Sequence, residues 1–158
     1  MQSTLKLTTA GPAETEALGE RLGSLLCGGE LVCLFGQLGA GKTVFVRGVA
    51  RAMGCPPDEV SSPTYVLERV YRGEHLLLRH LDAYRLSGAD EFEETDLGSP
   101  DLPANVVSAL EWADRVSEAL PAERLDVRIE VSADGRRCIE IMGHGDRGET
   151  VLAGLAAG

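Results

Sequence analysis

The sequence is poor in aromatic residues, in long apolar runs and in positive charge. Aromatic side chains make up 4% of its 158 residues, and the formal net charge is −10. These values disfavour proteins that grip nucleic acid over a broad basic face or stack bases on aromatic rings. The longest uninterrupted apolar run, residues 31–35, is far shorter than a membrane-spanning helix requires.

Cysteine is also sparse. The four cysteines include no Cys-x-x-Cys pair, and no histidine lies at ligand spacing from any of them, which disfavours a zinc site. Residues 1–9 lack the apolar core that a secretion signal needs. We therefore expect a cytoplasmic protein with free, buried thiols and no association with a membrane.

The sequence does contain alternating strand-like and helix-like segments. A short strand is expected near the N-terminus, followed by a helix that opens at Pro12 and ends at Gly28-Gly29. Further strands are expected over residues 31–35, 65–71, 76–81, 106–110, 126–131 and 138–142, and further helices over 43–53 and 112–120. This order predicts an α/β fold: one domain over residues 1–158, with a mixed sheet flanked by helices and an antiparallel hairpin near the C-terminus. The small, apolar tail, from about residue 148, is expected to fray or to cap the core.

The most specific signal is a phosphate-binding loop. Residues 36–43, Gly-Gln-Leu-Gly-Ala-Gly-Lys-Thr, match the pattern GxxxxGK[ST] in full and lie between a predicted strand and a predicted helix. The glycines let successive backbone N–H groups converge on a phosphate, and the helix N-terminus adds its positive dipole end. Lys42 supplies a point charge for the β- and γ-phosphates, and the Thr43 hydroxyl is a ligand for magnesium. The motif predicts a P-loop NTPase-like fold that binds a nucleoside triphosphate.

Two carboxylates are placed to complete such a site. Asp82 ends the strand predicted over residues 76–81, and Glu111 ends the strand predicted over 106–110. Ligands of open α/β sheets bind beyond the carboxyl ends of the strands, so both side chains are expected near the P-loop. Each would hold magnesium or orient the attacking water. The alternatives are a surface turn for Asp82 and an exposed helix cap for Glu111.

Four further features are less specific. Thr64 lies in a loop after the P-loop helix, where GTPase-like proteins place a switch segment, although a plain turn fits equally well. The single tryptophan, Trp112, is either a core or half-buried aromatic or part of the site. From spacing alone, Arg85, Arg136 and Arg137 are surface arginines, although Arg85 and either Arg136 or Arg137 would neutralise transition-state charge if they reached the phosphates. Residues 86–111 hold seven acidic and no basic side chains, which indicates a solvated acidic surface or a docking face for a basic partner.

Four motifs occur together in the order typical of one known family. They are Gly-Gln-Leu-Gly-Ala-Gly-Lys-Thr (36–43), Ser-Pro-Thr-Tyr (62–65), His-Leu-Asp-Ala-Tyr-Arg-Leu (80–86) and Glu-Trp (111–112). With them the chain resembles the TsaE family, formerly YjeE, the small bacterial P-loop ATPases of tRNA threonylcarbamoyladenosine biosynthesis. The resemblance covers nearly the whole chain. The P-loop alone is generic, whereas the four motifs in one chain of 158 residues are specific.

The resemblance implies a slow, Mg²⁺-dependent ATPase that is a subunit of a tRNA-modifying complex. Its partners would be the TsaD and TsaB proteins, which transfer a threonylcarbamoyl group to tRNAs decoding ANN codons, and it would meet tRNA only through that complex. By position, the nucleotide would be bound by Thr15, Gly39, Ala40, Gly41, Lys42, Thr43, Val44, Thr64 and Trp112. The catalytic residues would be Lys42, Asp82 and Glu111, and the magnesium ligands Thr43, Asp82 and Glu111. Which carboxylate holds the metal and which activates water stays open.

Gln37 departs from the family, which usually has Asp after the first glycine of the P-loop. The side chain there normally points away from the phosphates, so nucleotide binding is still expected, but a partner contact through that Asp is not carried over. Two other functions remain as alternatives, a small P-loop kinase and a nucleotide-switched binding module. Residues 86–111 lack the arginine-rich lid of such kinases, and the chain has no guanine-binding N/TKxD motif.

Overall fold

The computed structural model describes residues 3–63, 68–84, 92 and 103–158. Thr64, which the sequence placed in a switch-like loop, Arg85 and most of the acidic segment 86–111 lie outside these residues. Within the described residues, seven strands form one sheet in the spatial order β1-β7-β6-β2-β5-β4-β3. The strands are β1 Ser3–Thr9, β2 Leu31–Phe35, β3 Glu68–Arg72, β4 Leu77–Asp82, β5 Val106–Glu111, β6 Arg124–Val131 and β7 Arg137–His144.

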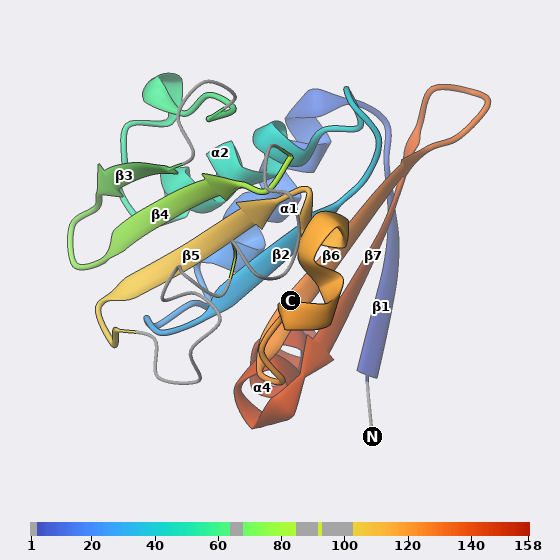
Figure 1. Ribbon diagram of the computed structural model, residues 1–158. Helices are drawn as coiled ribbons and strands as arrows, with labels where there is room; N and C mark the ends of the chain where they lie inside the picture. Colours follow the sequence, from blue (N-terminus) through green and yellow to red (C-terminus); the bar gives the residue numbers. More distant parts are fainter. Residues whose placement is uncertain (1–2, 64–67, 85–91, 93–102) are drawn as a thin grey trace.

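The sheet has a parallel centre with antiparallel additions on both sides (Figure 1). Strands β6, β2, β5 and β4 run parallel, whereas β3, β7 and β1 pair antiparallel with their neighbours. Every residue of β2 and of β5 is buried, as expected for parallel strands covered on both faces. This arrangement confirms the predicted mixed sheet and the hairpin near the C-terminus, which β6 and β7 form.

Two helices cover one face of the sheet. Helix α1 (Pro12–Gly23) opens at the predicted proline but ends before the Gly28-Gly29 pair, and α2 (Lys42–Ala52) follows the P-loop. The two helices pack against each other at backbone distance, because a Cβ on Gly19 would lie 2.2 Å from the Phe45 carbonyl oxygen. They enclose the larger apolar core together with alternate residues of β2, Val32 and Leu34.

The opposite face carries the helix predicted over 112–120, which is slightly shorter and of the 3₁₀ type. Residues Ala113–Ala119 form a 3₁₀ segment, η3, which is kinked at Val116. The buried or half-buried apolar residues Ala113, Val116 and Ala119 recur every third position. That spacing fits three residues per turn and aligns these side chains over the sheet. A second, shorter 3₁₀ helix, η1 (Pro57–Glu59), follows α2.

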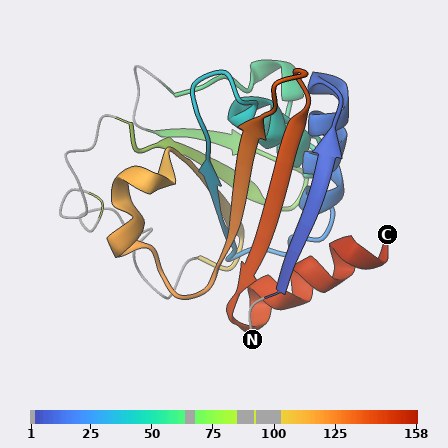
Figure 2. The same cartoon turned by 90° about the vertical axis from the view of Figure 1, so that its right-hand side faces the viewer.

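The C-terminal tail caps the core. Helix α4 (Gly145–Ala157) begins directly after β7 and buries Val151, Leu152 and Leu155 against the main core cluster. Figure 2 shows it running across one end of the sheet, near the start of β1. Of the two alternatives for the tail, the structure therefore shows capping. The helix was missed because glycine lowers the helix propensity of this segment, and tertiary packing overrides that weakness.

Two further expectations concern buried thiols and membrane association. All four cysteines are free, but only Cys33 and Cys55 are buried, whereas Cys27 and Cys138 are exposed. The expectation of buried thiols is thus right for two of them. In the part of the chain that the structure describes, no helix is both long and apolar enough to cross a membrane.

Candidate nucleotide site

The P-loop connects the buried strand β2 to α2 at the carboxyl ends of the parallel strands. Gly39 and Gly41 adopt positive φ angles of 79° and 115°, which side chains other than glycine rarely tolerate. Gly41 is also the N-cap of α2, and no side chain makes a capping hydrogen bond to the backbone N–H groups at the start of this helix. The loop therefore presents backbone donors at a helix N-terminus, which is the arrangement that binds phosphate.

The Lys42 side chain folds back into this loop. Its Nζ donates hydrogen bonds to the carbonyl oxygens of Gly36 (2.5 Å) and Gln37 (3.0 Å), and it lies 3.8 Å from the centre of the Trp112 ring. Burial lowers the pKa of this ammonium, and the negative charges of Glu111 and other nearby carboxylates oppose part of that shift. The cation is thus held at the loop by dipoles, a ring face and negative charges rather than by a direct ion pair.

A hydrogen bond connects the P-loop helix to the neighbouring strand end. The Thr43 hydroxyl donates to the Glu111 carboxylate, with distances of 2.9 Å to Oε2 and 3.1 Å to Oε1. Glu111 is 2% exposed at the end of β5, so it is not the exposed helix cap that the sequence left as an alternative. The two residues are 68 positions apart in the chain, and only the packing of α2 on the sheet brings them together.

Asp82 lies beside Glu111. The two residues are direct partners in the parallel pairing of β4 and β5, and Asp82 is buried. Its Oδ1 accepts the backbone N–H of Tyr84 at 2.8 Å, and its Oδ2 accepts the Ser62 hydroxyl at 3.5 Å. Burial raises the pKa of this carboxyl, and the negative charge of Glu111 adds to the rise. The strand-end positions in the sequence thus predicted the placement of both carboxylates correctly.

The donors gathered here suit a hard cation. Two neighbouring carboxylates and the Thr43 hydroxyl offer oxygen atoms, which are the ligands that Mg²⁺ prefers. Among the described residues, no group of three or more His, Cys, Asp and Glu side chains can hold a metal by itself. A Mg²⁺ ion bound to these oxygen atoms would therefore need further oxygen ligands, such as water or phosphate.

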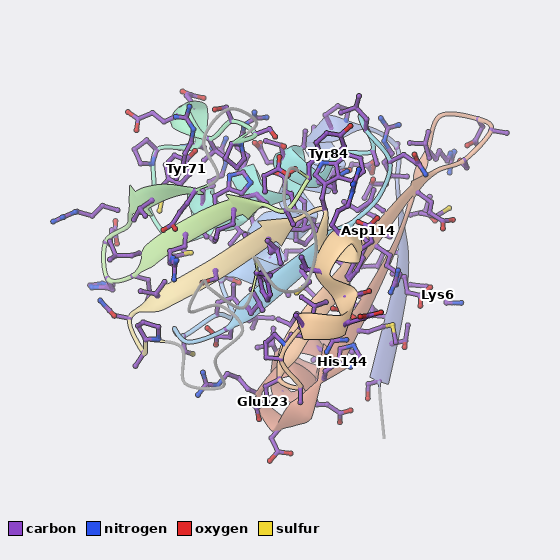
Figure 3. All side chains as sticks on the ribbon, viewed as in Figure 1. Lys6, Tyr71, Tyr84, Asp114, Glu123 and His144 are labelled. Atoms are coloured by element: carbon purple, nitrogen blue, oxygen red, sulfur yellow. The ribbon has the colours of Figure 1, made fainter. Side chains whose placement is uncertain are left out.

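Trp112 forms a wall of the site. It directly follows Glu111, is half-buried, and adopts a left-handed backbone conformation with φ 58°. Its ring lies over Lys42 and packs 5.0 Å from the ring of Tyr84. Tyr84 and Asp114 mark this end of the molecule in Figure 3, whereas His144 and Glu123 lie at the opposite end. Trp112 therefore lies beside Lys42 of the P-loop and is also half-buried against the smaller apolar cluster, and its contact with a nucleotide stays a prediction.

The other residues predicted to bind the nucleotide differ in how exposed they are. Gly39 is exposed, Ala40 is buried, and Val44 is half-buried in the first turn of α2. Thr15 is fully buried, and its hydroxyl bonds with the Thr9 hydroxyl (2.7 Å) and donates to the Gly11 carbonyl oxygen (3.2 Å). Its contact with a nucleotide stays a prediction.

Two residues at the site carry roles that the sequence reasoning did not assign. His80 is fully buried on β4 and bonds through Nε2 to the Glu111 carboxylate. Arg137, left as a surface arginine, donates from Nε to the Ala40 carbonyl oxygen (3.0 Å) and so holds the P-loop from β7. The period of two along a strand was a usable signal for His80, because it puts His80 on the same face as Asp82.

A cavity of about 470 Å³ opens next to the P-loop, at the carboxyl ends of β2 and β6. Gly36, Gln37 and Trp112 line it together with Arg128, whose guanidinium carbon lies 4.2 Å from the Phe35 ring centre. The Gln37 position, where the sequence departs from the family, therefore borders this cavity.

Comparisons with known proteins agree over most of the chain. Residues 9–139 match the family described as threonylcarbamoyl adenosine biosynthesis protein TsaE. The tRNA threonylcarbamoyladenosine biosynthesis protein TsaE of Streptomyces coelicolor is 41% identical over 148 residues, which cover 89% of this chain and 98% of that protein. Its namesake in Bacillus subtilis is 35% identical over 153 residues, covering 96% and 94%. The crystal structure of Bacillus subtilis YdiB matches with a TM-score of 0.77 at 32% identity, covering 99% of this chain and 97% of that one.

Proposed function

The chain belongs to the TsaE family, and from this premise we propose that it is the Mg²⁺-dependent ATPase subunit that supports formation of N6-threonylcarbamoyladenosine in tRNAs decoding ANN codons. It acts with the TsaD and TsaB proteins and reaches tRNA only through them. The observation that carries the proposal is the bond from Thr43 to Glu111, which joins the P-loop to a buried carboxylate at the strand ends. P-loop NTPases need a loop hydroxyl and a strand-end carboxylate at one metal.

Each residue of the site has a role in the proposed reaction. The N–H groups at the start of α2 bind the β-phosphate, and Lys42 turns from the loop carbonyls towards the β- and γ-phosphates. Thr43, Asp82 and Glu111 would hold Mg²⁺, which when bound neutralises charge on the phosphates. Whichever of the two carboxylates does not bind the metal is free to orient the attacking water.

The family name and the acidic surface together favour an ATPase that serves other proteins. A chain with net charge −10 is a poor carrier of tRNA, so we assign tRNA binding to the partners. The relatives' names place them in tRNA threonylcarbamoyladenosine biosynthesis. The energy of hydrolysis then serves the partner complex.

An ATPase assay with purified TsaD, TsaB and tRNA tests the proposal. We expect slow release of phosphate by the chain alone, and repeated formation of the modified nucleoside only when the chain and ATP are both present. Lys42→Ala and Thr43→Ala should each lower turnover by roughly 10²-fold or more, because each removes a group that acts on the phosphates or the metal. Their melting temperatures show whether they are folded.

Three results would contradict the proposal. Wild-type turnover in both variants would remove the P-loop from the reaction. Phosphate transfer to a small acceptor, with no effect of TsaD and TsaB, would identify a kinase. Saturable nucleotide binding without any hydrolysis, alone or with partners, would identify a binding module.

A further inference from the structure

His80 occupies a position where a histidine is costly. It lies on β4, is 0% exposed, and packs beside the ring of Tyr71, with 6.4 Å between ring centres. Its Nδ1 has no hydrogen-bond partner among the described residues. An unsatisfied polar atom in a buried place lowers stability, and an apolar side chain of similar volume would avoid that cost. The histidine therefore needs another reason to be there.

The other ring nitrogen supplies that reason. Nε2 of His80 bonds to Oε2 of Glu111, the same oxygen that accepts the Thr43 hydroxyl at 2.9 Å. We take Nε2 as the donor of this bond and the Glu111 carboxylate as its acceptor. The Glu111 carboxylate is thus held from two sides, by β4 through His80 and by α2 through Thr43.

We propose that His80 is a positioning residue that fixes the Glu111 carboxylate for the magnesium–nucleotide site. The inference rests on the proposed function and goes beyond it, because it gives a specific task to a residue that need not contact nucleotide or metal. Without the Nε2–H, the carboxylate keeps only the Thr43 hydroxyl as a donor among the described residues and is free to change rotamer. Such supporting hydrogen bonds commonly affect metal affinity strongly.

Two amide variants separate a hydrogen-bond role from a packing role. In His80→Gln the amide nitrogen reaches about as far as Nε2, whereas in His80→Asn it stops near the position of Nδ1. Calorimetry measures the affinity for ADP at increasing concentrations of Mg²⁺. The quantity compared is the Mg²⁺ concentration at which half of the total gain in ADP affinity is reached. His80→Asn and His80→Leu should raise that concentration about 10-fold or more, and His80→Gln should stay close to wild type.

Turnover gives a second readout. With ATP as substrate, His80→Asn and His80→Leu should lower kcat at saturating Mg²⁺ by a larger factor than they weaken the binding of ATP that calorimetry measures without the metal. The matched control is Tyr71→Phe, which keeps the ring beside His80 and removes a buried hydroxyl that has no hydrogen-bond partner among the described residues. It should leave the Mg²⁺ dependence and kcat unchanged.

A double-mutant cycle tests whether His80 acts through Glu111. In the Glu111→Gln background, His80→Leu should produce no further change in Mg²⁺ dependence, because the group that it positions is already altered. Additive effects of the two substitutions would overturn the proposal, and so would a wild-type Mg²⁺ dependence in a folded His80→Leu variant.

The wild-type protein also allows a test if the variants do not fold. Nitrogen-15 spectra should show His80 with its proton on Nε2, and the signal should shift when Mg²⁺ and ADP are added together. A neutral ring protonated on Nδ1 would overturn the proposal. Failure of the proposed function looks different, because then the wild-type protein would show no Mg²⁺-dependent nucleotide binding at all.

Discussion

At the scale of single residues, the site places negative charge where it is costly. Asp82 and Glu111 are both buried and are paired directly across β4 and β5. Burial and mutual repulsion are the usual causes of a raised carboxyl pKa, and both act on Asp82. Perturbed acids of this kind are common at functional sites, where affinity for a cation is gained at the expense of stability.

We predict that Asp82→Asn stabilises the protein without ligands and weakens its response to Mg²⁺. Because the pKa of Asp82 is raised in the folded state, the folded protein binds this proton more tightly than the unfolded chain does. Stability is therefore lost as the pH rises from the unfolded pKa, about 4, through the folded one. The amide keeps an acceptor for the Tyr84 N–H and removes the charge.

Thermal melting at several pH values checks this expectation. The melting temperature of Asp82→Asn should exceed that of wild type at neutral pH, and the difference should shrink as the pH falls towards about 4. In calorimetry the variant should gain less affinity for ADP from Mg²⁺. If Asp82→Asn is less stable than wild type at neutral pH, the charge of Asp82 does not destabilise the folded state, and the prediction is wrong.

We predict that Trp112 fluorescence reports nucleotide binding. The chain has one tryptophan, and the Lys42 ammonium lies 3.8 Å from its ring centre, so movement of the lysine towards phosphate changes the surroundings of the ring. Titration with ADP or ATP should change the emission saturably, and any enhancement by Mg²⁺ should vanish in Thr43→Ala. Flat emission during binding that calorimetry detects would place the nucleotide away from this ring.

At the scale of secondary-structure elements, the position of the P-loop depends on how closely α1 and α2 approach. The contact is made by glycines, and a Cβ on Gly48 would lie 2.0 Å from the Glu16 carbonyl oxygen and 2.7 Å from the Glu20 amide nitrogen. Both are backbone atoms of α1 and cannot move without the helix. Since α2 starts at Lys42, a shift of α2 also displaces the P-loop.

We predict that Gly48→Ala lowers the free energy of unfolding by about 1–3 kcal/mol, the usual cost of overpacking, despite its better helix propensity. Urea unfolding measures the loss, and affinity for ADP should fall as well. The matched control is Gly154→Ala in α4, where the Cβ would meet only the end of the Leu25 side chain at 3.2 Å. That variant should be as stable as wild type or more so. Equal losses in both variants would contradict close helix packing as the cause.

At the scale of the whole molecule, charge decides which partners the chain can hold alone. It carries 25 acidic and 15 basic residues, for a net charge of −10. Non-specific affinity for RNA comes mainly from the counterions that basic residues release from the phosphate backbone. A molecule this acidic repels tRNA at long range, and salt screens that repulsion only in part.

We predict that the isolated protein does not bind tRNA measurably at about 0.15 M salt. Fluorescence anisotropy with labelled tRNA should stay flat up to high protein concentration, while the same tRNA binds a mixture that contains TsaD and TsaB. Micromolar binding by the chain alone would contradict the proposal that it meets tRNA only through its partners.

The sequence by itself determined the features that depend on neighbouring residues. The P-loop is a local pattern, and its glycines, Lys42 and Thr43 follow one another along the chain. The buried strand before it is evident from five consecutive apolar residues, and the placement of Asp82 and Glu111 follows from their positions at strand ends. Such features could be predicted because local backbone geometry and side-chain period produce them.

Only the tertiary structure decided how these parts meet. The bonds that join Glu111 to Thr43 and to His80 span 68 and 31 residues, and no local pattern encodes such contacts. The same holds for α4, whose weak helix propensity is overcome by burying three apolar side chains, and for η3, which is kinked at Val116 where it packs on the sheet. In each case packing against distant residues outweighs local preference, because burial of apolar surface contributes more than the propensities of single residues.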